Sequence, residues 1–212
     1  MATTAVPAID LDGQHLSLEQ IGAIAQDGAP VRVTPEARAR VAAARRLVDE
    51  KFGIGDAIYG VTTGFGRLAN IKVEPQDAAL LQLNLVRSHA AGTGDPLSIE
   101  HVRAAGVLRA SSLAAGHSGI RESTLDLLVE LLNRGVTPYV PRQGSVGASG
   151  DLAPLAHMTL TLIGEGDAFY RGERMPAARA LELAGLQPIE LGAKEGLALV
   201  NGTEVMTGIG AL

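Results

Sequence analysis

Hydrophobic and polar positions alternate along most of this chain with the period of an α-helix. Leucine-rich segments cover residues 78–92, 99–116 and 123–135, and each of them ends in a glycine. Apolar residues three or four positions apart share one helix face, and a glycine is common just after the last helical residue. Three such segments in series predict a mainly helical body.

The first third of the chain carries signals for two further helices. Ser17 is a typical N-cap for a short helix over residues 18–26. Thr34, Pro35 and Glu36 supply a cap, a first-turn proline and an acid for a longer helix that is expected to end at Gly53. Residues 31–33, between the two helices, predict a brief strand.

The remaining segments are shorter and more varied. Residues 53–70 contain many glycines without a lasting period, which predicts a loop. A helix is expected to begin near Asp151, and residues 166–177 predict a small hairpin that turns at Arg171 and Gly172. Another short helix is expected over residues 178–186.

Composition narrows the possible functions. Apolar residues make up 46% of the chain but aromatic residues only 3%, so the core must consist of small and aliphatic side chains in close-packed helices. The absence of cysteine excludes disulfides and thiolate metal sites, and is typical of a cytoplasmic protein. A net charge of -5 disfavours nucleic acid as a partner. No apolar run is long enough for a membrane span, so a soluble protein without membrane contact is expected.

The segment GSVGASGD, residues 144–151, is rich in residues that let the backbone fold tightly on itself. It lacks the lysine of a phosphate-binding loop, and its glycine spacing differs from that of the dinucleotide fingerprint. It also differs from the G-x-S-x-G nucleophile turn, since Asp151 stands where the last glycine belongs. A loop that caps a helix is the alternative interpretation.

The longer string GSVGASGDLAPLAH resembles the signature of the aromatic amino acid lyase family, which comprises histidine, phenylalanine and tyrosine ammonia-lyases and aminomutases. The resemblance implies that Ala148, Ser149 and Gly150 cyclise and lose water, giving a 4-methylidene-imidazol-5-one (MIO) group without a metal or a nucleotide. The Gly150 nitrogen must then reach the Ala148 carbonyl carbon, a compressed geometry that small residues permit.

Three other segments match the family in the expected order. YGVTTGFG resembles a loop whose tyrosine transfers a proton or contacts the amine, which points to Tyr59. NLVRSHAAGTG resembles the segment that meets the substrate ring, here through His89. LVNGTEVMTG resembles the segment whose asparagine binds the prosthetic group and the substrate, here Asn201. A packed tyrosine, a structural histidine and an Asn-Gly turn are the respective alternatives.

Asp151 has two compatible interpretations: it could support formation of the MIO group by polarising the cyclising backbone, or cap the following helix. A hydrolase triad of Ser149, His157 and Asp151 is disfavoured, because positions six apart on one helix do not face the same point. The remaining histidines lack the spacing of metal ligands, so no metal site is expected.

The resemblance implies that residues 1–212 are the N-terminal, MIO-forming domain of the helical ammonia-lyase/fumarase-like fold, with a few short strands and a small hairpin. The long C-terminal helical bundle would be missing from this fragment, and the complete enzyme would be a homotetramer.

Ser88 and His89 resemble the histidine-specific enzymes, so the expected reaction converts L-histidine to trans-urocanate and ammonia. Thr62-Thr63 and EVMTG keep tyrosine or phenylalanine lyases and aminomutases as alternatives. An inactive folding or interaction domain that docks with a separate C-terminal chain is a further alternative.

Overall fold

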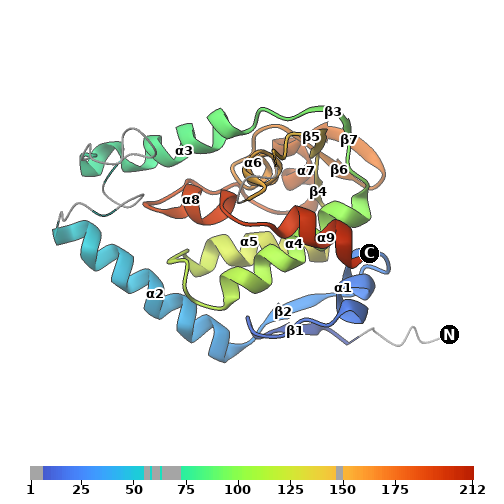
Figure 1. The fold of residues 1–212 in the computed structure, drawn as a ribbon, viewed down its shortest axis with the longest axis horizontal. Helices are drawn as coiled ribbons and strands as arrows, with labels where there is room; N and C mark the ends of the chain where they lie inside the picture. The colour runs from blue at the N-terminus through green and yellow to red at the C-terminus, as the bar shows by residue number, and fades with distance from the viewer. Residues whose placement is uncertain (1–6, 55–57, 59–62, 64–72, 147–149) are drawn as a thin grey trace.

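The computed structural model describes residues 7–54, 58, 63, 73–146 and 150–212, and helices dominate it, as the sequence predicts (Figure 1). The helices are α1 (Leu18–Ala25), α2 (Pro35–Ile54), α3 (Ala78–His89), α4 (Ile99–Ala114), α5 (Glu122–Arg134), α6 (Leu152–Leu162), α7 (Ala177–Ala184), α8 (Glu195–Val200) and α9 (Glu204–Ala211), with a 3-10 turn at Pro75–Asp77. The strands are β1 (Ile9–Leu11), β2 (Val31–Val33), β3 (Thr93–Pro96), β4 (Thr137–Pro138), β5 (Pro141–Gln143), β6 (Asp167–Tyr170) and β7 (Glu173–Pro176).

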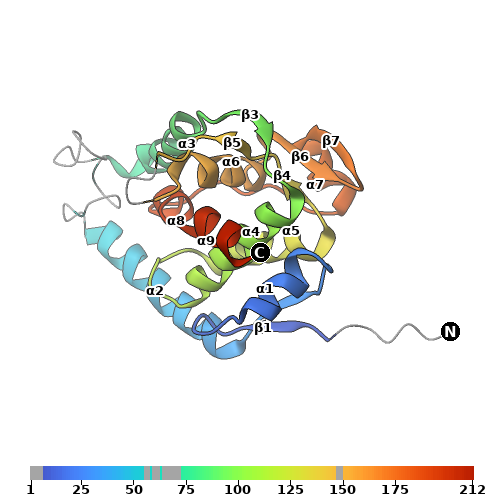
Figure 2. The ribbon, with the colours of Figure 1, turned by 45° about the vertical axis from the view of Figure 1, so that its right-hand side comes forward.

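Helix α4 lies at the centre and packs against α1, α2, α5 and α9. Its alanines Ala104 and Ala105 are fully buried. Gly208 of α9 approaches α4 so closely that a Cβ atom there would come within 2.8 Å of the Ala105 nitrogen. Both ribbon views show α9 alongside α4 (Figures 1 and 2). Small residues therefore do the packing that aromatic side chains do in other cores.

Most predicted helix ends agree with the structure. Ser17 and Gln20 form a capping box at the start of α1, and Gly135 ends α5 in the left-handed conformation with a φ of 70°. Helix α2 continues through Gly53 to Ile54, one residue past the predicted end. Within the described residues, no helix combines the length and the apolar character needed to cross a membrane.

The short strands join segments that are distant in sequence. β1 and β2 pair in parallel on either side of α1, while β6 and β7 form the predicted hairpin. Its turn residues, Arg171 and Gly172, both have positive φ angles, which match the right-handed twist of a tight hairpin. β3 pairs with β5 in antiparallel fashion, with Thr93 opposite Gln143. This pairing brings the chain after α3 beside the start of the glycine-rich loop.

Candidate active site

A set of hydrogen bonds around Asp151 connects the glycine-rich loop to the start of α9. The Asp151 amide donates to the Gly202 carbonyl at 2.7 Å. One carboxylate oxygen accepts from the Ser145 hydroxyl at 2.9 Å, and the other accepts from the Met206 amide at 2.8 Å. These residues, together with Gly150, are called the Asp151 junction below.

The predicted capping role of Asp151 toward α6 is wrong. Asp151 occupies the N-cap position of that helix, but its side chain makes no capping hydrogen bond there. Its carboxylate turns to α9, where Met206 lies in the first turn and its amide has no partner within the helix. Asp151 is 4% exposed, so this contact joins two helices through a buried charge.

Gly150 meets the segment that follows α8. Its φ angle is 150°, a conformation that side chains rarely adopt. A Cβ atom on Gly150 would lie 3.1 Å from the Gly202 carbonyl oxygen and 3.7 Å from Oδ1 of Asn201. The structure thus brings together two residues predicted to belong to one site, Gly150 and Asn201, although they are 51 positions apart in the sequence.

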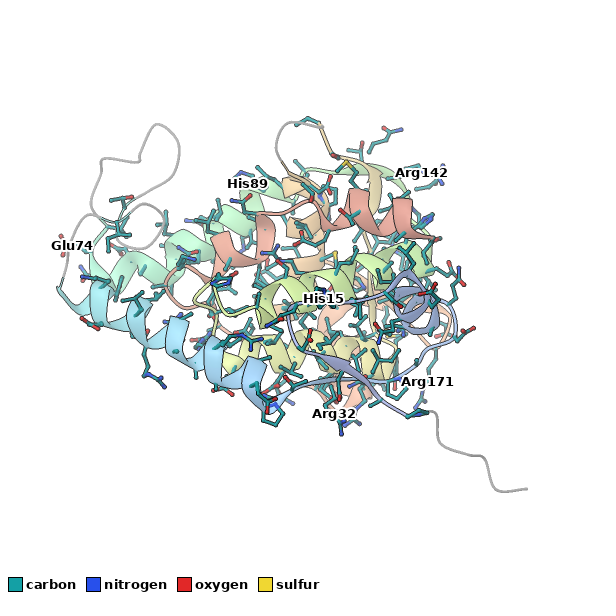
Figure 3. The ribbon with its side chains drawn as sticks, turned by 60° about the horizontal axis from the view of Figure 1, so that its bottom comes forward. His15, Arg32, Glu74, His89, Arg142 and Arg171 are labelled. Carbon is teal, nitrogen blue, oxygen red and sulfur yellow. The ribbon has the colours of Figure 1, made fainter. Side chains whose placement is uncertain are left out.

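His89 is the last residue of α3 and is half-buried (Figure 3). Its Nδ1 atom lies 2.8 Å from the Leu85 carbonyl oxygen. Because a carbonyl only accepts, this contact requires the proton on Nδ1 and leaves Nε2 of the neutral ring as an acceptor. Three residues later, Gly92 packs against Gly144, whose Cβ position would be 3.2 Å from the Gly92 Cα atom.

His157 takes part in no triad with Asp151. Its Nε2 atom accepts a hydrogen bond from the Gly92 amide at 3.0 Å, while the Asp151 carboxylate is bound to Ser145 and Met206. Burial lowers the pKa of His157 below its ordinary value of 6.5, because the charged ring loses its hydration. The neutral ring is also the form that can accept the Gly92 proton.

This lowered pKa predicts a loss of stability on mild acidification. Between the folded and the ordinary pKa of His157, the unfolded chain binds a proton that the folded chain does not, so the free energy of unfolding decreases as pH falls below about 6.5. Urea unfolding at several values between pH 7.5 and 5.5 measures this slope. The His157→Gln variant keeps an acceptor for Gly92 but cannot titrate, so its curve is expected to be flatter. Equal slopes for both proteins would contradict the prediction.

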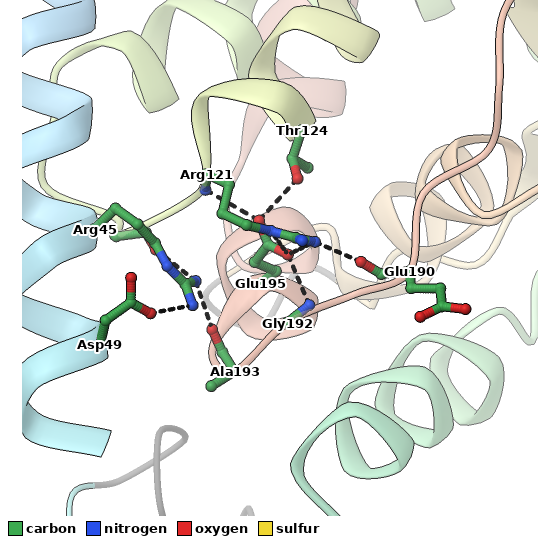
Figure 4. Close-up of polar contacts among 9 residues, drawn as sticks. Arg45, Asp49, Arg121, Thr124, Glu190, Gly192, Ala193 and Glu195 are labelled. Atoms are coloured by element: carbon green, nitrogen blue, oxygen red, sulfur yellow. Dashed lines mark hydrogen bonds and ion pairs between the residues drawn. The ribbon is translucent and has the colours of Figure 1, made fainter. Parts of the chain in front are cut away.

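Helix α8, which leads to Asn201, is fixed at its beginning by a buried carboxylate. Glu195 has no exposed surface and accepts hydrogen bonds from the Arg121 guanidinium, from the Arg121 amide at 3.0 Å, from the Thr124 hydroxyl at 2.8 Å and from the Gly192 amide at 2.7 Å. Figure 4 shows Glu195 at the centre of these contacts. One acidic side chain thereby connects α5, α8 and the loop before α8.

The end of α8 is fixed by a second buried ion pair. A guanidinium nitrogen of Arg109, in α4, lies 2.6 Å from Oε1 of Glu204, in α9, and the two side chains are 6% and 11% exposed. Arg109 also donates to the Asn201 carbonyl at 3.0 Å and to the Ala198 carbonyl. These contacts satisfy carbonyl groups at the C-terminus of α8, where the helix dipole favours a cation.

Three predicted site residues, Tyr59, Ala148 and Ser149, lie outside the described residues. In the described part of the chain, no group of three or more acidic, histidine or cysteine side chains is arranged to hold a metal ion. The described site therefore consists of Gly150, Asn201 and the contacts that hold them.

Comparison with known proteins defines the family. The family profile described as aromatic amino acid lyase matches residues 16–212. The chain belongs to the aromatic amino acid lyase family. Histidine ammonia-lyase from Streptococcus sanguinis (strain SK36) is 53% identical over 204 residues, which cover 96% of this chain and 40% of that protein. This lyase chain thus spans about 40% of the length of such relatives.

Two of the solved structures that share the fold of this chain are a tyrosine aminomutase and a histidine ammonia-lyase. Tyrosine aminomutase from Streptomyces globisporus superposes with a TM-score of 0.91 at 40% identity, over 97% of this chain and 38% of that one. Histidine ammonia-lyase from Trypanosoma cruzi superposes with a TM-score of 0.90 at 39% identity, over 97% and 39%. The mainly helical lyase fold predicted from the sequence is therefore confirmed.

Several residues that hold the candidate site were missed from the sequence. Arg109 had a signal, since it is a cation within the apolar segment VLRASSLAAG, and a charge at such a position needs a buried partner. Glu204 had a weaker signal, because an acidic residue in the first turn of a helix is also common on the protein surface. Ser145 and the Met206 amide had no signal in the sequence. Met206 contacts Asp151 across 55 positions, and the contact of Ser145 with Asp151 depends on the geometry of the loop.

Proposed function

We propose that this chain forms the MIO-bearing part of an enzyme that eliminates ammonia from L-histidine to give trans-urocanate. The observation that carries the proposal is the meeting of Gly150 with Asn201 at the Asp151 junction. It is supported by 53% identity to a protein named histidine ammonia-lyase. The described residues fit the group, since the Gly150 position has no room for a side chain beside the Gly202 carbonyl.

Formation of the group needs only the chain itself. The Gly150 nitrogen attacks the Ala148 carbonyl carbon, and a new C–N bond closes the ring. The carbonyl oxygen leaves as water with the hydrogens of the Gly150 and Ser149 nitrogens, which leaves a carbon–nitrogen double bond between the Ala148 carbonyl carbon and the Ser149 nitrogen. Ser149 then loses its hydroxyl and its Cα hydrogen as a second water, which leaves a carbon–carbon double bond. The hydrogen bond from the Asp151 amide to Gly202 holds the C-terminal side of the triplet in place during ring closure.

The finished group supplies an electron-poor carbon that makes the substrate amine a better leaving group. In this proposal the amide of Asn201 hydrogen-bonds the group and the substrate, a role supported by its exposure and its closeness to Gly150. Nε2 of His89 accepts a hydrogen bond from the N–H of the substrate imidazole. In this proposal Tyr59 transfers a proton or contacts the amine.

A tyrosine-specific reaction is the second candidate, because a tyrosine aminomutase is among the similar structures and the His89 ring could also meet a phenol oxygen. Steady-state assays of the complete protein with L-histidine, L-tyrosine and L-phenylalanine separate these substrates. We expect the value of kcat/KM to be highest for L-histidine. A higher value for L-tyrosine would assign the second candidate.

Replacing Ser149 with alanine is expected to abolish formation of the double bond. In the unaltered protein, the tryptic peptide of residues 143–171 should be lighter by two waters, about 36 Da, than its sequence requires. In the Ser149→Ala variant the serine water cannot be lost, so the peptide should be lighter by at most the one water of ring closure, about 18 Da. Ser112→Ala, which alters an exposed serine of α4, is the matched control and should leave the peptide mass unchanged.

A full-mass peptide from the unaltered protein would contradict the proposal for this chain. The complete protein would then have to be measured in the same way, and a full-mass peptide there would contradict the proposal altogether. If the chain is instead a folding or interaction domain, the C-terminal part of a relative added in trans should bind it.

A further inference from the structure

We propose that Arg109 is a positioning residue for the Asp151 junction: paired with Glu204, it holds the Asn201–Gly202 turn against Gly150, and this placement sets the rate at which the triplet cyclises. The inference rests on the proposed function, because cyclisation is the step that it controls. Arg109 belongs to α4 and does not contact Gly150 itself, so its effect passes through the turn.

The Arg109 side chain makes several contacts in and around the turn. The Arg109 guanidinium donates to the carbonyls of Ala198 and Asn201 and to the Glu204 carboxylate. These three acceptors lie before, within and after the turn. Arg109 is 5% exposed, so water cannot replace these contacts when they are lost.

The turn is also in close steric contact with the Arg109 and Glu204 pair. Gly202 lies directly over the ion pair, and a Cβ atom there would overlap Oε2 of Glu204 and a guanidinium nitrogen of Arg109. The turn therefore rests on the pair without an intervening side chain. Any movement of Arg109 or Glu204 changes the position of the Gly202 backbone, because close-packed groups transmit displacements.

The turn in turn contacts Gly150, the last residue of the triplet. The Gly202 carbonyl accepts the Asp151 amide proton at 2.7 Å and is the nearest atom to the Cβ position of Gly150, at 3.1 Å. The nitrogen that closes the ring belongs to Gly150, which is the residue pressed against this carbonyl. A shift of about 1 Å in a reacting group can cost two orders of magnitude in rate. The Arg109 pair is therefore placed to control cyclisation through the Asn201–Gly202 turn.

Helix α4 contains a matched control for this role. Arg103 is also buried, at 8% exposure, and donates to the carbonyls of Ile24, Ala25 and Leu132. Both arginines thus bind carbonyl groups of neighbouring helices, but the acceptors of Arg103 lie in α1 and α5, whereas those of Arg109 include Asn201 of the turn and Glu204. The variants Arg109→Met and Arg103→Met remove equal charge from the same helix, and Arg109→Lys tests whether a cation alone suffices.

The experiment follows two quantities in folded, purified protein. The first is the fraction of peptide 143–171 that has lost two waters, measured against time after synthesis. The second is the hydrogen exchange rate of the Asp151 amide, whose acceptor is Gly202. We expect Arg109→Met to slow the loss of water at least tenfold and to speed this exchange at least tenfold. Arg103→Met should change neither beyond its effect on global stability, and Arg109→Lys should restore part of both.

Equal effects of the two methionine variants on both quantities would overturn the inference, since Arg109 would then act only through stability. If peptide 143–171 of the unaltered chain loses no water, the proposed function fails for this chain. The exchange rate of the Asp151 amide in Arg109→Met then still tests whether Arg109 positions the turn. Unchanged exchange of the Asp151 amide in Arg109→Met would overturn that role independently of any cyclisation.

Discussion

Replacing Glu195 with alanine is expected to lower the free energy of unfolding by about 4 kcal/mol. The substitution leaves the Gly192 amide, the Arg121 amide and the Thr124 hydroxyl without their acceptor. A buried donor without a partner costs about 1 to 3 kcal/mol. The Arg121 side chain is 38% exposed and regains water, which keeps the loss below that of a fully buried pair.

Urea unfolding at pH 7 measures this loss. Glu182→Ala is the matched control, because Glu182 pairs with Arg179 on the surface of α7 and is 68% exposed. Its loss should be about 0.5 kcal/mol or less. A loss below about 1 kcal/mol for Glu195→Ala would contradict the role of Glu195 in holding α5 and α8 together.

The same carboxylate predicts a pH dependence. Burial raises the pKa of Glu195, but hydrogen bonds from Arg121, Gly192 and Thr124 outweigh it, and the pKa lies below the ordinary value of 4.5. The unfolded chain then takes up the proton first, so this contribution to stability is present above pH 4.5 and is lost as pH falls further. Glu195→Ala should lose less stability than the unaltered protein between pH 5 and pH 3.

Replacing Gly202 with alanine is expected to cost at least about 3 kcal/mol of stability and to prevent cyclisation. The added methyl group would overlap both members of the buried Arg109 and Glu204 pair, so the pair must separate or the turn must move. Separation leaves buried charges without a partner, and movement withdraws the Gly202 carbonyl from Asp151. Thermal unfolding and the mass of peptide 143–171 measure the two effects.

Gly210→Ala is the matched control for this substitution. Gly210 lies in α9, and a Cβ atom there would have nothing within 4 Å. Alanine favours helix formation over glycine, so this variant should be unchanged or more stable by up to about 1 kcal/mol. Equal stability of the Gly202→Ala and Gly210→Ala variants would show that the turn tolerates a side chain and would contradict the prediction.

The long helices could be predicted because their signals are local. Apolar spacing defined α3, α4 and α5, and Ser17 and Gly135 marked ends that the structure confirms. The strands β1, β3, β4 and β5 were missed, because two to four residues carry no measurable period and their pairing depends on distant segments. Helix α8 was missed for the same reason, since it has only six residues and is stabilised by Glu195 and Arg109.

The candidate site was also predicted only in part from the sequence. Gly150 and Asn201 were predicted by resemblance to a family signature, and the structure brings them together. Of the two roles predicted for Asp151, the capping role was wrong, because an acid before a helix usually binds that helix and the sequence does not show that α9 is closer. Its support of MIO formation stays a prediction. The family resemblance thus predicted which two residues meet, and tertiary contacts decided what Asp151 binds.

The distance along the chain between Asp151 and Met206 also sets an order of events during synthesis. These partners are 55 positions apart. At a translation rate of about 5 to 20 residues per second, Met206 is made roughly 3 to 11 s after Asp151. Asp151 is therefore made before Gly202, whose carbonyl accepts the hydrogen bond from the Asp151 amide. In the proposed mechanism, ring closure depends on this acceptor and begins only once the Asn201–Gly202 turn has emerged, so we expect the newborn protein to pass through a stage in which Ser149 is still an ordinary serine.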